Sequence, residues 1–363
     1  MDAFSLLMML LPLVWPLLLG GLLFQAIPDL TRPGLFFGVT VDPQFRESQI
    51  GRGIRRRYSI GVWIGTLIAI ALVVTAEFAA TGTAWAPTAL AALVTRARLR
   101  HLLWVLQSVV ALWAFVRAHR ETRPHAAQPA SVVKVELSTR LPATSAILAV
   151  LAVPIASLAV LAVWTGIRWH DVPSRLAVHW AFAGPDRWVM TTPANVAKLL
   201  SVHAVVCLLF AAITLGVLHG SRRIATAGEA ALRERRFRAR NVSFLIVVEY
   251  FSVFPAWAGL LGLPATAMTL WQLVFPATIL VLLARLVLAG QGGTRGLARD
   301  NSAVGDRTDD RYWALGILYF NRGDPAFLVE KRFGVGYTFN FAHPLAWALL
   351  TLLAAIPFIT RLL

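Results

Sequence analysis

Long apolar runs, separated by short polar segments, dominate the pattern of the chain. A helix needs about twenty mostly apolar residues to cross a bilayer, because the hydrocarbon core is roughly 30 Å thick and each residue rises about 1.5 Å. The apolar runs approach or reach that length. We predict membrane-spanning helices over residues 4–24, 60–80, 101–118, 146–167, 196–218, 242–261, 268–288 and 345–359.

Charge fixes the position of the third span. Arg96, Arg98 and Arg100 divide a longer apolar stretch, and three guanidinium groups in the middle of a bilayer would be costly. The span therefore begins at His101. The preceding residues 87–94 are left as an interfacial or re-entrant piece, and the count comes to about eight spans.

Composition supports a membrane environment. Hydrophobic residues make up 58% of the 363 residues and charged residues only 14%, whereas about a quarter of a soluble domain is charged. Many of the thirteen tryptophans lie near the ends of apolar runs, where an amphipathic ring is stable at the level of the lipid headgroups. The chain is therefore predicted to be an integral membrane protein.

The net charge is +16, and the distribution of the basic residues among the loops orients the protein in the membrane. Segments 25–59, 117–140, 220–241 and 290–344 are rich in arginine and are alternate loops, so the positive-inside rule places all four in the cytoplasm. No DNA- or RNA-reading motif accompanies the charge, and no nucleic-acid partner is expected. We predict a multi-pass protein of the inner (plasma) membrane with both termini outside.

The sole cysteine, Cys207, lies inside an apolar run. It excludes an internal disulfide and any zinc site built on cysteines. No cofactor is predicted.

The spans and loops suggest five regions. We divide the chain into an N-terminal membrane region with three spans (1–140), a two-span unit with an outer loop (141–220), a basic cytoplasmic segment with two spans (221–289), a cytoplasmic insertion (290–344) and the last span (345–363). Within the third region, residues 229–240 have the pattern of an amphipathic helix lying at the membrane surface.

Two loops are too strongly patterned to be simple connectors: the outer loop 169–189 and the inner loop 309–347. In the inner loop, Tyr337, Phe339 and Phe341 alternate with polar residues, which predicts a strand. Residues 321–325 have the composition of a turn. The expected fold is an all-α polytopic membrane protein with a small cytoplasmic β-hairpin element before the last helix.

The outer loop carries a family resemblance. Its segment "VPSRLAVHW..AGPDRW" resembles a signature shared with the sporulation-delaying-toxin immunity protein family of Gram-positive bacteria, although Ala181 stands where that family usually has asparagine. The matching residues are His179, Trp180, Gly184, Pro185, Asp186 and Trp188. The resemblance implies protection against a membrane-active peptide and a signal passed to a regulatory partner.

The inner loop resembles a second, uncharacterised domain found in similar membrane proteins. The match includes Trp313, Gly316, Tyr319, Asn321, Asp324, Pro325, Val329, Lys331, Arg332, Gly334, Gly336, Thr338, Asn340 and Phe341. The early segment "FFGVTVDP" also resembles a part of these proteins. This resemblance implies no defined activity.

Ionisable residues gather on the predicted outer side, and they form the first candidate site. They are Glu77, His101, His179, Asp186 and His203. Such groups are costly near a membrane unless they pair or face water. Three interpretations stay open: hydrogen bonding that holds the loop, a proton or ligand site, and a divalent-metal site, since histidine and carboxylates are metal ligands.

Two further sets lie toward the predicted cytoplasmic side. Glu249 lies about two turns inside its span, where it either pairs with a facing helix or couples to an ion. In the inner loop, Asn321, Asp324, Lys331 and Arg332 are candidates for contact with a partner protein or with anionic lipid. The spacing around Lys331 does not match a phosphate-binding loop.

Three functions compete. The resemblance and the lack of a catalytic motif favour a non-enzymatic receptor, immunity or signalling protein. Glu249, with Pro255 and Pro276 inside spans, suggests instead an ion- or proton-coupled secondary transporter, but no internal repeat supports it. A metal-dependent intramembrane enzyme using His179 and Asp186 ranks last, because no nucleophile or paired carboxylate motif accompanies them.

Overall fold

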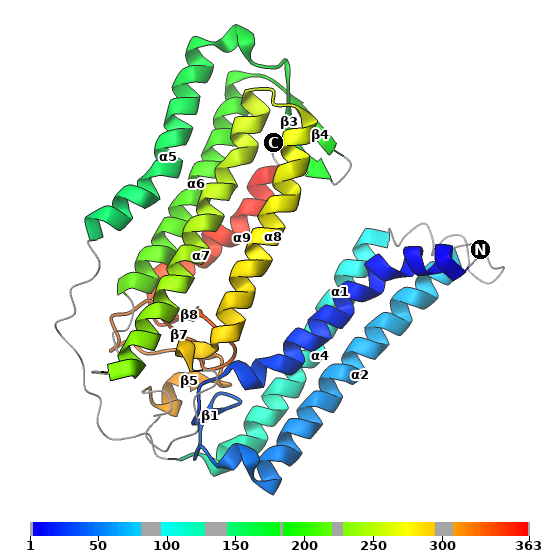
Figure 1. Cartoon of the computed structure of the whole chain (residues 1–363), viewed down its shortest axis with the longest axis vertical. Helices are drawn as coiled ribbons and strands as arrows, with labels where there is room; N and C mark the ends of the chain where they lie inside the picture. The colour runs from blue at the N-terminus through cyan, green and yellow to red at the C-terminus, as the bar shows by residue number, and fades with distance from the viewer. Residues whose placement is uncertain are drawn as a thin grey trace. The chain divides into compact units, whose positions relative to one another are not determined.

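The computed structural model describes residues 3–80, 96–127, 144–181, 184–219, 228–294 and 308–361, and within them the chain is mostly helical (Figure 1). The long helices are α1 (Ala3–Leu30), α2 (Gln49–Ala80), α4 (Arg96–Thr122), α5 (Thr144–Ile167), α6 (Pro193–His219), α7 (Gly228–Leu260), α8 (Ala265–Ala289) and α9 (Pro344–Arg361). Each predicted span lies within one of these helices, except that Leu261 is one residue past the end of α7, so the helices at these positions are confirmed.

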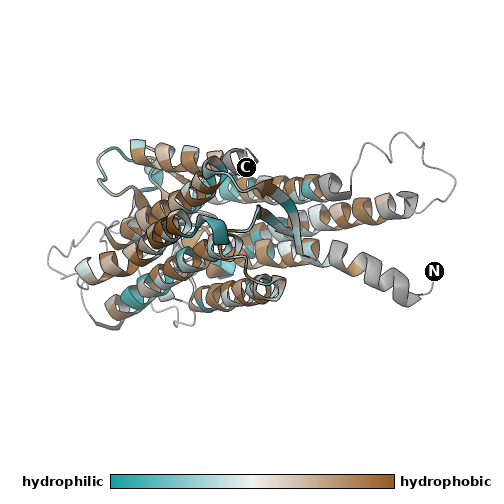
Figure 2. Ribbon diagram, turned by 90° about the horizontal axis from the view of Figure 1, so that it is seen from above, coloured by the Kyte–Doolittle hydropathy of each residue, from teal (hydrophilic) through white to brown (hydrophobic). Residues whose placement is uncertain are grey.

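Six helices, α2 and α4 to α8, are long and apolar enough to cross a membrane. Among the described residues α1 and α9 hold shorter apolar stretches, 14–30 and 344–355. Large apolar side chains such as Leu102, Val105 and Leu280 are exposed on these helices, and hydrophobic residues run along their length (Figure 2). Exposed apolar surface of this extent is typical of helices that face lipid.

The chain divides into two compact units. Unit 1 comprises Met1–Ser131, Gly296–Ile317 and Arg332–Val335. Unit 2 comprises Val132–Arg295, Leu318–Lys331 and Gly336–Leu363. The inner loop therefore contributes chain to both units.

Unit 1 packs α1, α2 and α4 together. Between the helices, Gln107 donates from Nε2 to the Leu17 carbonyl oxygen at 2.8 Å and to Thr66 Oγ1 at 2.9 Å. Tyr58 donates its hydroxyl to the Phe24 carbonyl oxygen at 2.8 Å. Such hydrogen bonds hold apolar helices together where burial in lipid gives no driving force.

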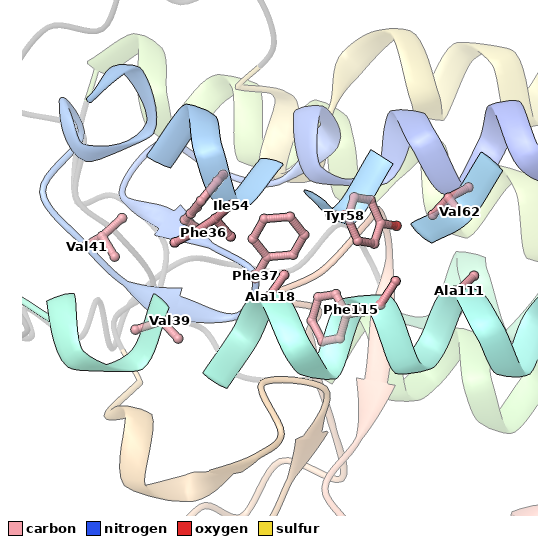
Figure 3. Close-up of a cluster of buried hydrophobic side chains, with 11 residues drawn as sticks. Phe36, Phe37, Val39, Val41, Ile54, Tyr58, Val62, Ala111, Phe115 and Ala118 are labelled. Carbon is pink, nitrogen blue, oxygen red and sulfur yellow. The ribbon is translucent and has the colours of Figure 1, made fainter. Parts of the chain in front are cut away.

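A hydrophobic core closes one end of unit 1 (Figure 3). Its centre is Phe37, whose ring lies 4.9 Å from that of Tyr58 and 5.8 Å from that of Phe115. The short elements around it are β1 (Leu35–Phe36), β2 (Val39–Thr40), η1 (Phe45–Glu47), η2 (Arg123–His125), η5 (Asp310–Tyr312) and β5 (Trp313–Ala314). The end of α4 is thereby covered by two segments far apart in the sequence.

Those two segments both form two-residue turns with positive φ. Phe37 (φ 44°) and Gly38 (φ 78°) join β1 to β2, and Leu315 (φ 53°) and Gly316 (φ 71°) form an equivalent turn. Positive φ at both central positions defines the tight turn that favours glycine second. The turns touch: a Cβ on Gly38 would lie 2.5 Å from the Gly316 carbonyl oxygen. A side chain at Gly38 would therefore separate them.

Unit 2 contains α5 to α9, and its two apolar clusters are formed mainly by residues of α5, α6 and α7 with the short strands. One contains Leu161, Leu176, Cys207 and Ala256, and the other includes Leu328. The short elements are η3 (Trp169–Asp171), β3 (Arg175–Ala181), β4 (Gly184–Met190), η4 (Gln291–Gly293), β6 (Leu318–Tyr319), β7 (Leu328–Glu330) and β8 (Tyr337–Phe339). Strands β3 and β4 pair antiparallel, as do β7 and β8.

The strand expected at Tyr337 and Phe339 is present as β8, so the hairpin before the last helix is confirmed. The hairpins β1–β2 and β3–β4 were not expected. Residues 229–240 are helical, as predicted, and their place at the membrane surface stays a prediction. This segment is the first part of α7, because its helix-forming residues meet the following apolar span with no proline or glycine to end the helix.

Candidate functional site

A buried arginine centres the polar cluster of unit 1. The side chain of Arg332 is 0% exposed. Its Nη1 donates to Asp310 Oδ1 at 2.6 Å and to the Gly38 carbonyl oxygen at 3.1 Å. Its Nη2 donates to the carbonyl oxygen and the hydroxyl of Thr308, and the guanidinium lies 5.1 Å from the ring centroid of Trp313. One side chain thus joins three separate stretches of chain.

Asp310 is the counter-charge, and its carboxylate is also bound by Thr40. The backbone N–H of Thr40 donates to Oδ2 at 3.2 Å, and its hydroxyl donates to Oδ1 at 2.7 Å. A buried charge is stable only when it is paired and hydrogen-bonded. Arg332 meets that condition, so it is a structural centre rather than a group available to a ligand.

His119 fastens the β1–β2 turn to α4. Its Nδ1 lies 2.9 Å from the Phe37 carbonyl oxygen, so Nδ1 carries the proton and donates it. His119 is 9% exposed, and a Cβ on Gly316 would lie 2.8 Å from the same Nδ1. The two turns and the end of α4 are therefore in close contact.

These elements surround a cavity of about 690 Å³. Binding sites for small molecules are typically a few hundred to about a thousand Å³. The cavity is lined by Gly38, Val39, His119, Arg120, Arg123, Ala126, Asp310, Arg311, Trp313, Ala314 and Leu315. Of its titratable acid–base groups, His119 and Asp310 are both already hydrogen-bonded. The described lining holds no serine, threonine, cysteine or lysine side chain.

The predicted outer loop is the β3–β4 hairpin of unit 2. His179 in β3 pairs with Arg187 in β4, and His179 is exposed. The register shifts on both sides of His179, which leaves Asp186 as an extra residue between the partners of His179 and Trp180. The backbone therefore brings His179 and Asp186 to neighbouring positions. The side chain of Asp186 lies outside the described residues.

The other members of the outer set are divided between the units. Glu77 in α2 and His101 in α4 belong to unit 1, and the side chain of Glu77 lies outside the described residues. His203 belongs to unit 2, where its Nδ1 donates to the Ser252 carbonyl oxygen at 2.7 Å. Within the described part of the chain, no group of three or more histidine, cysteine, aspartate or glutamate side chains could hold a metal. A shared outer pocket stays a prediction.

Glu249 in α7 is the least satisfied buried charge-bearing group in the described part of unit 2. It is 0% exposed, and neither carboxyl oxygen has a hydrogen-bond partner among the described residues. Thr214 Oγ1, in α6, is likewise buried without a partner there. The structure therefore shows no pairing of Glu249 with a facing helix in the described ranges.

The inner-loop candidates differ in burial. Asp324 is 6% exposed and accepts hydrogen bonds from the Tyr319 hydroxyl and the Ala326 N–H, both at 3.0 Å. With Arg332 it is held inside the protein, so neither can contact lipid or a partner directly. Lys331 is exposed and Asn321 half-buried. A contact role for these two stays a prediction.

Asn340 explains why the inner loop is ordered. It is 0% exposed. Its Nδ2 donates to the carbonyl oxygens of Asn321, Asp324 and Ala326 at 2.8 to 3.2 Å, and its Oδ1 accepts from the Asn321 and Ala342 N–H groups. One amide side chain thus closes the turn at 321–326 onto the end of β8.

The sequence did not indicate the cavity. Its walls come from residues near 38, 120 and 312, and local spacing does not reveal which of them meet. The only available signal was the repeated pattern of a large apolar residue, glycine and a β-branched residue at Phe37-Gly38-Val39 and Leu315-Gly316-Ile317. That pattern is compatible with two matching turns, but it does not show that they touch.

Comparison with known proteins adds little about activity. A family model described as "Family of unknown function (DUF5808)" matches residues 322–347, from the turn before β7 to the start of α9. This is a small part of the chain, and the description names no activity. No curated protein and no solved structure matches the chain.

Replacing Arg332 should destabilise the protein, whereas replacing its neighbour should not. Arg332→Gln removes the partner of Asp310 and the donors to Gly38 and Thr308, and the loss of one member of a buried pair costs about 3 kcal/mol or more. We expect a clearly lower unfolding temperature in detergent and faster proteolysis within 308–335. Lys331→Gln, at an exposed residue, is the matched control. Equal stability of the two variants would refute the central role of Arg332.

Proposed function

We propose that this chain is a non-enzymatic membrane protein of the receptor, immunity or signalling type, with about eight spans in the plasma membrane. The cavity in unit 1 is the observation that carries the proposal. It has the size of a ligand site, and an ordered cluster around Arg332 forms one wall. Its histidine and carboxylate are engaged in hydrogen bonds, so the lining offers recognition without catalytic groups.

The ordered inner loop supports a signalling role. Residues of this loop are fixed by Arg332 in unit 1 and by Asn340 in unit 2. A loop that belongs to both units can pass a change in one of them to the other. In this proposal its exposed residues, Lys331 among them, contact a cytoplasmic regulatory protein or the lipid surface.

The proposed topology has the β3–β4 hairpin outside and the inner loop in the cytoplasm, as the distribution of basic loops favours. Ser174→Cys and Arg322→Cys, both at exposed residues, test it in a Cys207→Ala background. A membrane-impermeant thiol reagent applied to intact cells should label the first variant and not the second. The reverse pattern of labelling would overturn the orientation.

In the proposed function the outer hairpin meets the extracytoplasmic ligand, which the family resemblance suggests is a membrane-active peptide. His179 is exposed at the bulge of the hairpin. Cells that express the chain should tolerate such a peptide better than cells without it, and His179→Ala should abolish that protection while the protein still reaches the membrane.

His170→Ala is the matched control for this prediction, because His170 is also an exposed histidine of the outer loop but lies before β3. Protection is measured as growth in the presence of the peptide, with membrane insertion checked in parallel. Full protection by His179→Ala, or equal loss in both variants, would remove the hairpin from the proposed mechanism.

Glu249 favours a second candidate, a cation- or proton-coupled transporter. A buried ionised carboxyl with no partner is costly, and a proton or a bound cation would remove that cost. Pro255 and Pro276 lie inside α7 and α8, as in helices that flex during transport. For this function, the cation or proton site would lie among the helices of unit 2 instead of in the cavity of unit 1.

Sodium should discriminate between the two candidates. A cation that binds only the folded protein stabilises it, and the stabilisation increases with the cation concentration. If Glu249 holds the cation, replacing choline by sodium will raise the unfolding temperature of the wild type and of Glu234→Gln, a control on the same helix, but not of Glu249→Gln. A pH series read in the same way tests for a proton. Identical responses in all three proteins would exclude the coupled transporter.

A further inference from the structure

Two of the cationic side chains that line the cavity have no partner among the described residues. Arg120 and Arg123 have neither an ion-pair nor a hydrogen-bond partner in the part of the chain that the structure describes, and both are exposed. Arg311, by contrast, pairs through Nε with Asp309 Oδ2 at 3.1 Å. Arg120 and Arg123 are three residues apart across the end of α4 and the start of η2, a spacing that places side chains side by side on a helix.

The described lining of the cavity has little negative charge to oppose them. Asp310 is the one carboxylate among the lining residues that the structure describes, and it is already bound by Arg332 and by Thr40. Among the described lining residues, no carboxylate is left to neutralise the charges of Arg120 and Arg123. A site with two adjacent free guanidinium groups attracts a multivalent anion.

We propose that this cavity binds a phosphate-bearing organic anion. Planar guanidinium groups match the oxygen spacing of phosphate and bind it through paired hydrogen bonds, so Arg120 and Arg123 hold the phosphate. Val39, Ala314 and Leu315 supply an apolar part of the wall for the organic moiety. The cavity of about 690 Å³ is much larger than a single phosphate ion requires. This inference rests on the proposed function and deepens it by naming the class of ligand that the cavity binds.

The site lies near the expected level of the lipid headgroups. On the same helix, Trp113 is 58% exposed and lies 5.8 Å from the guanidinium of Arg117, an arrangement typical of the membrane interface. Arg120 and Arg123 follow Trp113 by about 10 and 15 Å along the helix axis. A phospholipid headgroup and a water-soluble phosphate compound share the required chemistry, and both can approach from this side.

Two probes separate these sources. The first is phosphatidylglycerol, introduced into phosphatidylcholine nanodiscs that hold the full-length protein. The second is sodium pyrophosphate, titrated into the same protein in pure phosphatidylcholine nanodiscs. Binding is followed as the rise in unfolding temperature with probe concentration. A saturable rise with the first probe alone identifies a lipid site, and a rise with the second identifies a site open to soluble phosphates.

The test variant is Arg120→Gln/Arg123→Gln, and the control is Arg52→Gln/Arg56→Gln. Arg52 and Arg56 are exposed residues of α2 in the same unit, have no ion-pair or side-chain hydrogen-bond partner among the described residues, and lie outside the cavity. Both variants remove two positive charges. We expect binding to weaken by roughly tenfold or more only in the cavity variant, because that variant alone loses the charge-assisted hydrogen bonds to the phosphate.

A third variant tests the cavity itself. Ala314→Trp keeps every charge but places a large side chain at an exposed lining residue, and it should weaken binding as well. Equal weakening in the control double variant would show that the probes bind the basic surface in general. That result, or no saturable response to either probe, would overturn the proposal. Arg120 and Arg123 would then serve only to complement the dipole at the end of α4.

Discussion

The ion pair between Arg332 and Asp310 is the interaction on which the described end of unit 1 depends. Arg332 is fully buried, and its donors are distributed over Asp310, Gly38 and Thr308. Each of these contacts offsets part of the cost of taking a guanidinium out of water. If one segment moved away, Arg332 would lose a hydrogen-bond partner, and no water reaches the buried side chain to replace it. The three segments are therefore held in one arrangement.

The arrangement of the three segments depends on close contacts of the two glycine turns. The Gly38 carbonyl oxygen accepts from Arg332, while the same residue packs against Gly316 too closely for a side chain. His119 then fixes the first turn through the Phe37 carbonyl oxygen. Since the backbone of both turns lies against the cavity, its shape is set by contacts that leave little freedom. A rigid wall lowers the entropy cost of binding a ligand.

The helices could be predicted because a membrane span is a local feature of the sequence, a run of about twenty apolar residues. The strand at Tyr337 was also visible, because its aromatic residues alternate. Strands of two residues, such as β1 and β5, are too short to show alternation. The partners of Arg332 were invisible for another reason: Gly38 is 294 residues away along the chain. From the sequence alone Arg332 was therefore predicted to be a surface contact.

The buried charge-bearing groups of the two units differ in how well they are hydrogen-bonded, and this difference distinguishes a structural group from a candidate functional group. The guanidinium of Arg332 is hydrogen-bonded to the segments around it, as a buried group that stabilises the fold requires. Glu249 is as deeply buried, but its oxygens have no partner in the described ranges. In the transporter hypothesis, a proton or cation carried by Glu249 removes that cost. Arg120 and Arg123 resemble Glu249 in lacking partners among the described residues, but they line a cavity instead of a closed core. A ligand can reach them without any movement of the helices, so a binding function needs fewer assumptions than transport.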